Sequence, residues 1–342
     1  MRRIVIVRTD RIGDVVLSTP VIQALRRAYS DAFIAMMVAP HARELVEGNP
    51  SLNEVIVFDK GKAAGIADSI RFARRLRAYH FDTAVILHPT VRVHIITAMA
   101  LIKRRIGYDT KWGFLLTERV PHEKQFGAKH EIDYNLDLLK TLGIQARDRR
   151  PFIAVKPENR LKVAALLEQN GFGKGDSFVA IHPGASCPSK RWPGERFARV
   201  ADEIAKRFHT RVVIVAGANN RDCGLRMSDA MEHDALDLSG DLGVGELMAL
   251  LERARLLISN DSGPVHIAVA LGIPVVAIFG RNQPGLSFKR WGPVGDNDVV
   301  LYKDVGCLEC LAHDCKTGFQ CLMAIEPHEV IEAAAKLLTV AR

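Results

Sequence analysis

Aromatic residues are scarce, at 6% of the 342 residues, and no basic stretch is interleaved with Phe, Tyr or Trp. Single-stranded nucleic acid needs such a stacking platform, so we expect no nucleic-acid partner. Long apolar runs are missing too: the longest, residues 91–102, contains Arg92 and His94 and falls short of the roughly 18 residues that span a bilayer. The apolar run after Met1, residues 4–7, is too short for a signal-peptide core. We therefore expect a cytoplasmic protein with at most a peripheral membrane contact.

Cysteines are few, six in all, and a reducing cytoplasm argues against a disulfide framework. Four of them follow the spacing C-x2-C-x4-C-x5-C: Cys307, Cys310, Cys315 and Cys321. Four thiolates so close in sequence suit a tetrahedral structural zinc or iron site, although free or buried thiols remain an alternative. Such a closed site has no open coordination position, so we expect no catalytic role for it.

The composition is that of an ordinary globular protein, with 48% apolar and 25% charged residues. The length suggests about two domains. Lys and Arg exceed Asp and Glu by 47 to 39, and the net charge of +8 favours an anionic partner without naming it.

Short β-rich runs alternate with amphipathic helical patterns from residue 4 to 87, and the alternation restarts at residue 178 after a glycine-rich break at 171–176. Strands separated by helices predict parallel sheets, whose ligands bind at the carboxyl ends of the strands. We therefore expect an α/β protein of two doubly wound domains facing across a cleft, residues 1–165 and 166–325. The basic segment 110–129 has no clear period and is expected to be a functional loop. The helical pattern within residues 326–342 cannot be assigned to either domain.

The first strand runs into a loop, residues 8–15, with one glycine and two carboxylates. The loop has neither the three spaced glycines of a dinucleotide site nor the Lys-Ser/Thr of a P-loop. Gly13 would let a ligand approach the backbone, and Asp14 at a helix start should be charged at pH 7. Alternatively, Asp10 or Asp14 caps the helix.

A second loop, residues 181–193, also follows a strand and gathers small residues, hydroxyls such as Ser186, and two cations. Lys190 as a point charge and Arg191 as a fork suit a phosphate or diphosphate. Trp192 and Pro193 are expected to start the next helix, with the indole in the core.

A third segment, residues 256–266, reads strand, tight loop and helix, with Pro264 in the first turn. The free backbone N–H groups of Ser262 and Gly263 predict an anion site for a pyrophosphate. Asp261 would repel a phosphate, so it is expected to accept hydrogen bonds from sugar hydroxyls or to orient a cation. His266 could donate to phosphate or be structural.

Together these segments resemble glycosyltransferase family 9, the ADP-heptose:lipopolysaccharide heptosyltransferases. The resemblance spans nearly the whole chain and rests on motifs in this order: Ile12-Gly13-Asp14, Ser18-Thr19-Pro20, His182-Pro183-Gly184-Ala185, Lys190-Arg191-Trp192-Pro193, Asn260 to His266, Ala270 to Pro274 and Phe279-Gly280. It implies the GT-B fold, with two Rossmann-like domains, the acceptor on the N-terminal side and the nucleotide sugar on the C-terminal side. It also implies that the last helix, within residues 326–342, crosses back to the first domain.

The resemblance further implies an inverting transfer of heptose from ADP-heptose to an anionic lipopolysaccharide inner-core acceptor at the cytoplasmic face of the inner membrane. Asp14 would be the general base, Lys190 would neutralise the departing ADP, and no cofactor or catalytic metal would be needed. Phosphate binding would fall to Ser262, Gly263 and His266, and heptose hydroxyls to Asp261. The carboxylate expected near the ribose is represented by Asp222, about one position late. In some autotransporter heptosyltransferases a comparable four-cysteine element holds iron.

Three other interpretations remain open at this point. The chain could use another nucleotide sugar, it could modify a protein acceptor, or it could bind a nucleotide sugar without catalysis. Basic residues recur in the first domain and would suit an anionic acceptor at a bilayer surface, although a solvated surface is the usual explanation. They are Arg71, Arg74, Arg75, Arg77, Lys103, Arg104, Arg105, Lys111, Lys124 and Lys129.

Overall fold

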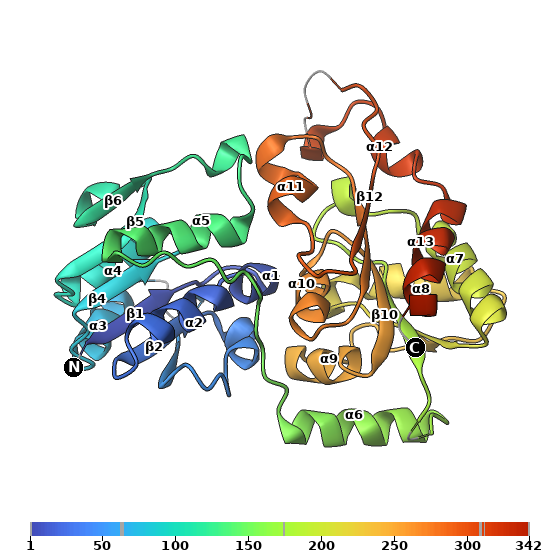
Figure 1. Ribbon diagram of the computed structural model, residues 1–342, viewed down its shortest axis with the longest axis horizontal. Helices are drawn as coiled ribbons and strands as arrows, with labels where there is room; N and C mark the ends of the chain where they lie inside the picture. The colour runs from blue at the N-terminus through green and yellow to red at the C-terminus, as the bar shows by residue number, and fades with distance from the viewer. Residues whose placement is uncertain (1, 62–64, 174, 308–309, 311, 341–342) are drawn as a thin grey trace. The chain divides into compact units, whose positions relative to one another are not determined.

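The computed structural model describes residues 2–61, 65–173, 175–307, 310 and 312–340. The chain divides into two compact units, Met1–Ala154 and Val155–Arg342, which we call the N-terminal and C-terminal units (Figure 1). The predicted boundary at residue 165 is wrong, because it falls inside helix α6 (Pro157–Gln169). This helix packs against α9 (Val244–Leu251) of the C-terminal unit, where Arg160 forms an ion pair of 2.7 Å with Glu252.

The N-terminal unit is built on a six-stranded parallel sheet in the order β3-β2-β1-β4-β5-β6. Its strands are β1 (Arg3–Val7), β2 (Phe33–Val38), β3 (Glu54–Val57), β4 (Thr83–Ile86), β5 (Arg104–Asp109) and β6 (Glu118–Pro121). The central strands are runs of apolar and β-branched residues that are fully buried, as expected where helices cover both faces of a sheet. Helices of this unit are α1 (Ile12–Val16), α2 (Thr19–Ala28), α3 (Ile66–Arg77), α4 (Val91–Met99) and α5 (Glu131–Asp137).

The C-terminal unit repeats this plan with a six-stranded parallel sheet in the order β12-β11-β10-β7-β8-β9. Its strands are β7 (Phe178–His182), β8 (Arg211–Ile214), β9 (Leu236–Asp237), β10 (Ala254–Asn260), β11 (Val275–Phe279) and β12 (Val299–Tyr302). Besides α6 and α9, its helices are α7 (Gly194–Phe208), α8 (Arg221–Asp229), α10 (Gly263–Ala270), α11 (Phe288–Trp291), α12 (Gln320–Met323) and α13 (Pro327–Val340). Two α/β units, each with a parallel sheet, confirm the predicted fold class.

The order of the strands places the candidate residues. In each sheet the first strand of the unit lies centrally, with neighbours reached by crossovers in opposite directions along the sheet. At such a switch point the loops after adjacent strands part and leave room for a ligand. In the N-terminal unit the switch point lies between β1 and β4. In the C-terminal unit it lies between β7 and β10.

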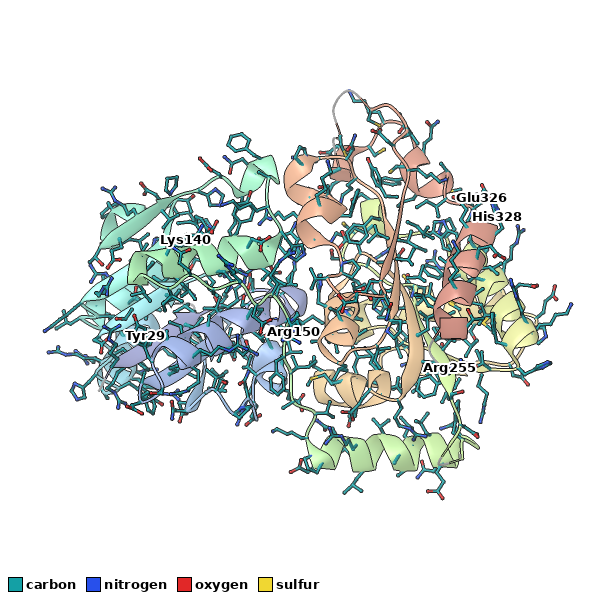
Figure 2. The ribbon with its side chains drawn as sticks, viewed as in Figure 1. Tyr29, Lys140, Arg150, Arg255, Glu326 and His328 are labelled. Atoms are coloured by element: carbon teal, nitrogen blue, oxygen red, sulfur yellow. The ribbon has the colours of Figure 1, made fainter. Side chains whose placement is uncertain are left out.

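The last helix, α13, belongs to the C-terminal unit. Val330, Ala334 and Leu338 are buried in one core cluster with Trp192 and Phe197. Arg255, labelled in Figure 2, lies at the start of β10. Its side chain donates a 2.8 Å hydrogen bond to the carbonyl of Leu338. The expectation that this helix crosses back to the first domain is therefore wrong, because its apolar face packs against α7 and the second sheet.

The 110–129 segment is less irregular than expected, because it contains β6 and two short 3-10 helices, Gly113–Leu115 and Lys124–Phe126. β6, β9 and β12, which the sequence pattern did not show, are all edge strands. In the part of the chain that the structure describes, no helix combines the length and apolar character needed to cross a membrane.

Candidate functional site

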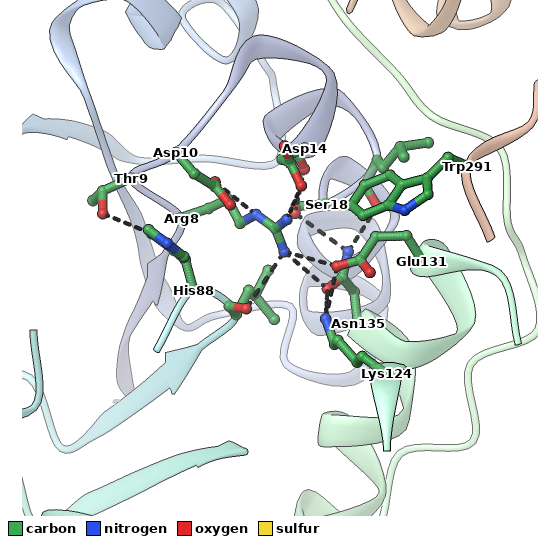
Figure 3. A network of polar contacts seen from close by, with 12 residues as sticks. Arg8, Thr9, Asp10, Asp14, Ser18, His88, Lys124, Glu131, Asn135 and Trp291 are labelled. Atoms are coloured by element: carbon green, nitrogen blue, oxygen red, sulfur yellow. Dashed lines mark hydrogen bonds and ion pairs between the residues drawn. The ribbon is translucent and has the colours of Figure 1, made fainter. Parts of the chain in front are cut away.

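In the N-terminal unit, a buried arginine organises the loop after β1. Arg8 is 3% exposed, and its guanidinium reaches three carboxylates in three directions (Figure 3). Nε donates to Asp10 at 2.8 Å, Nη1 donates to Glu131 at 3.1 Å, and Nη2 donates to Asp14. Although burial opposes its charge, these three carboxylates raise the pKa of Arg8 above its ordinary value. Arg8 is therefore a permanent cation at the carboxyl end of the central strand.

Asp14 lies in the first turn of α1 with a side chain that is only 14% exposed. Burial raises the pKa of Asp14 to about 6; Arg8 opposes this rise, and the charges of Asp10 and Glu131 add to it. Its main chain is fixed as well, since Ser18 donates to the Asp14 carbonyl at 2.7 Å. Asp14 makes no side-chain cap at this helix, whose N-cap is Arg11. A carboxylate with a pKa close to neutrality can accept a proton from a hydroxyl and release it again.

His88 follows β4 and lies on the other side of the same network. Its Nδ1 is 3.2 Å from the hydroxyl of Thr9. Burial, together with the charges of Arg8, Lys60 and Lys111, lowers the pKa of His88 to about 3. The imidazole is thus neutral at physiological pH and adds no positive charge beside Asp14.

In the C-terminal unit, Asn260 joins the loops after β7 and β10. Its side chain accepts from the backbone N–H of Trp192 at 3.0 Å and donates to the carbonyl of Pro183 at 2.7 Å. Trp192 is 1% exposed and packs edge-on against Phe197, which confirms its expected place in the core. Gly184 is required in the first of these loops, because a Cβ there would lie 2.9 Å from the side chain of Asn220.

Asp261 pairs with two cations at the carboxyl end of β10. The buried carboxylate lies 2.9 Å from Lys190 Nζ and 2.8 Å from Arg281 Nη2. Gly280 makes this meeting possible, because a Cβ at that position would lie 3.0 Å from the carbonyl oxygen of Ser189. Two cations and one carboxylate leave one net positive charge, which suits an anionic ligand.

Ser262, the N-cap of α10, is part of a small hydrogen-bonded cluster. Its hydroxyl lies 2.9 Å from that of Ser259 and 3.2 Å from Nδ1 of His182. Burial lowers the pKa of His182 to about 4, so the ring is neutral at pH 7. A neutral imidazole can orient the serine hydroxyl without holding an anion itself.

The remaining predicted residues are distributed unevenly. Gly13 is buried in α1, while Gly263 and the buried His266 lie in the first turn of α10 with Ser262. Ser186 is exposed, and its hydroxyl contacts only the sulfur of Cys187 among the contacts found for it.

Asp222 is not brought to the loop after β7. It is an exposed residue of α8 that lies 3.4 Å from Arg226. From the same region it is Asn220 that reaches this loop, accepting from Arg191 at 2.9 Å. Arg191 also donates to the carbonyl of Ala185, so its guanidinium holds the loop together.

The four clustered cysteines lie around one cavity of the C-terminal unit. Cys307, Cys310, Cys315 and Cys321 line a cavity of about 160 Å³ together with Tyr302 and Phe319. Among the residues that the structure describes, no three His, Cys, Asp or Glu side chains are arranged to hold a metal ion. The predicted zinc or iron site is therefore not supported by the described residues.

Arg8, His88, Glu131, His182 and Arg281 are polar residues of these networks to which sequence reasoning gave no role. Arg8, Arg281 and His182 share one signal: each lies at or just after the end of a buried strand, where a polar residue interrupts an apolar run. Glu131 has no such signal, because it reaches Arg8 across a separation of 123 positions.

The model of glycosyltransferase family 9 (heptosyltransferase) matches residues 69–319. The chain belongs to glycosyltransferase family 9. Its expected identity as a glycosyltransferase is thereby confirmed.

Similar proteins cover the family 9 chain almost end to end. Lipopolysaccharide heptosyltransferase 3 of Escherichia coli is 26% identical, over 95% of this chain and 96% of its own length. A solved family 9 glycosyltransferase from Veillonella parvula has a TM-score of 0.89 and 28% identity, covering 99% of this chain and 97% of its own. The E. coli ADP-heptose lipopolysaccharide heptosyltransferase II has a TM-score of 0.82 at 22% identity, covering 99% of both chains. The second of these structural likenesses shows the fold alone, and that fold is the predicted GT-B class.

Proposed function

We propose that this family 9 enzyme transfers heptose from ADP-heptose to an anionic lipopolysaccharide inner-core acceptor, with inversion and with Asp14 as the general base. The observation that carries the proposal is the environment of Asp14. Its carboxylate is mostly buried and is held by Arg8, and burial raises the pKa of Asp14 to about 6. A base is most effective when its pKa lies near the working pH. The names of the relatives supply the sugar and the acceptor.

In this mechanism Asp14 takes the proton of the acceptor hydroxyl while the hydroxyl oxygen forms a bond to the anomeric carbon. The bond from that carbon to the phosphate oxygen breaks on the opposite face, and ADP leaves with the electron pair. The configuration at the anomeric carbon is therefore inverted. The proton on Asp14 is then lost to water.

The C-terminal unit would hold the donor. The net positive charge of Lys190, Arg281 and Asp261 supports a role in stabilising the charge that grows on departing ADP. Ser262 and Gly263 at the start of α10 would donate to the phosphates, with His266 beside them. Asp261 would orient Lys190, and its remaining lone pairs would accept from a heptose hydroxyl.

A turnover assay with ADP-heptose, UDP-sugars and GDP-sugars tests the donor and the base together. We expect ADP release only with ADP-heptose and a core-truncated lipopolysaccharide, and a product with the anomeric configuration opposite to that of the donor. Asp14→Asn should lower kcat by about 100-fold or more without changing the Kd of the donor. Asp31→Asn, at an exposed position, is the matched control. Turnover with another nucleotide sugar would overturn the assignment of ADP-heptose as the donor. An active Asp14→Asn variant would overturn the role of Asp14 as the base.

We also propose a peripheral contact of the N-terminal unit with the cytoplasmic face of the inner membrane. Trp112 and Phe114 support it: they are 46% and 68% exposed and lie ring to ring at 5.7 Å, next to the exposed Lys111. Exposed aromatic rings beside a cation suit the interface of an anionic bilayer. Trp112→Ser with Phe114→Ser should weaken sedimentation with phosphatidylglycerol vesicles, whereas Leu161→Ser, exposed on α6, should not. Equal sedimentation of both variants would contradict the contact.

A further inference from the structure

A second buried carboxylate faces the proposed base from a distant part of the chain. Glu131 is the first residue of α5 and is 0% exposed. Its Oε1 accepts from Arg8 Nη1 at 3.1 Å and from Lys124 Nζ at 2.7 Å. Glu131 and Asp14 are thus partners of the same guanidinium, bound to different nitrogens (Figure 3).

The charges in this network do not balance. Asp10, Asp14 and Glu131 carry three negative charges, and Arg8 and Lys124 carry two positive charges, which leaves one negative charge in excess. Because the guanidinium is shared among three carboxylates, each receives only part of its stabilisation. In the contacts found for them, Asp10 and Asp14 are each paired with Arg8 alone, whereas Glu131 is also paired with Lys124.

The charged and titratable groups around Asp14 come from three parts of the N-terminal unit. The β1 loop supplies Arg8 and Asp10, α5 supplies Glu131, and the loop after β4 supplies His88, which is neutral above a pKa of about 3. Lys124 acts on the network through Glu131 and through Asn135, at 3.5 Å. The negative groups that oppose the charge of Asp14 are therefore Asp10 and Glu131, and of the two only Glu131 is fully buried.

We propose that Glu131 is a positioning residue that sets the basicity of Asp14 by competing with it for Arg8. This inference rests on the proposed role of Asp14. With Glu131 in place, Arg8 fixes the orientation of the Asp14 carboxylate but does not hold its charge so strongly that the base becomes weak. Lys124 limits the competition, because it neutralises part of the charge of Glu131.

The decisive variant is Glu131→Gln, which keeps the size and a carbonyl acceptor but removes the charge. Arg8 then stabilises the charged form of Asp14 more strongly, which lowers the pKa of Asp14. In the plot of kcat/KM against pH, we expect the acidic limb to move to lower pH by about 0.5 to 1 unit. Asp14 becomes a weaker base, so the plateau rate should fall by about three- to tenfold. A side chain that only supports the fold would change the rate or the stability without moving the limb.

Lys124→Met should produce the opposite shift, because it leaves the charge of Glu131 without its second cation. The acidic limb should then move to higher pH. In a Glu131→Gln background the Lys124→Met shift should largely disappear, since Lys124 acts through Glu131. Glu118→Gln, at a partly exposed ion pair with Arg104, is the control and should leave the limb in place.

The outcomes separate this inference from the proposed function. Opposite shifts that cancel in the double variant support it, and shifts of the same sign, or none, in variants with wild-type circular dichroism overturn it. If Glu131→Gln does not fold, the Lys124→Met variant decides alone. An acidic limb at higher pH supports the inference, and a limb that is unchanged or at lower pH overturns it. Full activity of Asp14→Asn would instead overturn the proposed base, whatever these variants show.

Discussion

Arg281 donates to Asp261 at 2.8 Å from a backbone in the left-handed region, with φ of +59°. A non-glycine residue in this region costs roughly 1 to 2 kcal/mol, and such strain persists where surrounding contacts overdetermine it. Here the contact is a buried ion pair in which both side chains are 6% exposed. The strain at Arg281 is thus offset by the pairing that also orients Lys190.

Arg281→Ala should lower the free energy of unfolding by about 1 to 3 kcal/mol, because Asp261 stays buried with only one cation. Arg281→Gly loses the same pair but adopts φ of +59° without a Cβ, so it should be about 1 kcal/mol more stable than Arg281→Ala. Urea unfolding in a Trp112→Phe background measures this, since two of the three tryptophans, Trp192 and Trp291, then remain and both lie in the C-terminal unit. If Arg281→Gly were less stable than Arg281→Ala, the inferred backbone strain at position 281 would be contradicted.

His182 should make the C-terminal unit sensitive to acid. Its pKa is lowered by burial from 6.5 to about 4, so between these values the unfolded chain binds a proton that the native state does not. The free energy of unfolding therefore falls as the pH drops from 6.5 toward 4, by about 2 kcal/mol at pH 5. His182→Asn, which keeps a polar group near Ser262, should lose this part of the pH dependence.

The measurement for His182 is urea unfolding at pH 7 and pH 5, compared between wild type and variant. His209→Asn is the control, because His209 is exposed in the same unit and its φ of +47° suits asparagine. It should keep the wild-type difference between the two pH values. An unchanged difference in His182→Asn would mean that this ring does not carry the acid sensitivity.

Local patterns in the sequence were sufficient for most of the fold. β7 begins at residue 178, where the alternation was predicted to restart, because buried parallel strands are uninterrupted apolar runs. Four strands were not predicted. Three of them, β6, β9 and β12, lie at sheet edges, where half-exposed side chains weaken the pattern. The fourth, β5, lies inside the first sheet, but its apolar run is short because it begins with Arg104 and Arg105. Motif positions were predictable for the same reason: Asp14 and Lys190 follow strands, and the pattern locates strand ends.

Long-range pairing was not predictable in this way. Glu131 meets Arg8 only because the fold brings the start of α5 to the loop after β1, and nothing in the local sequence of either residue shows it. Asp222 was expected near the ribose from the resemblance to the family, but its side chain on α8 is exposed and pairs with Arg226. The sequence pattern did not assign the last helix to either domain, because an amphipathic helix is compatible with any apolar surface. The expectation that it crosses back came from the resemblance, and the packing of α13 differs from it.

The packing of α13 gives a direct test of that assignment. Leu338 is 2% exposed within the core cluster of the C-terminal unit, so Leu338→Ala should lower the free energy of unfolding of this unit by about 2 to 4 kcal/mol. Leu161→Ala removes the same atoms from a position that is 72% exposed and should change it by less than about 0.5 kcal/mol. Fluorescence of Trp192 and Trp291 in the Trp112→Phe background reports the C-terminal unit. If Leu338→Ala instead destabilised only the N-terminal unit, as measured by hydrogen exchange in β1 and β4, the expectation that this helix crosses back would be supported.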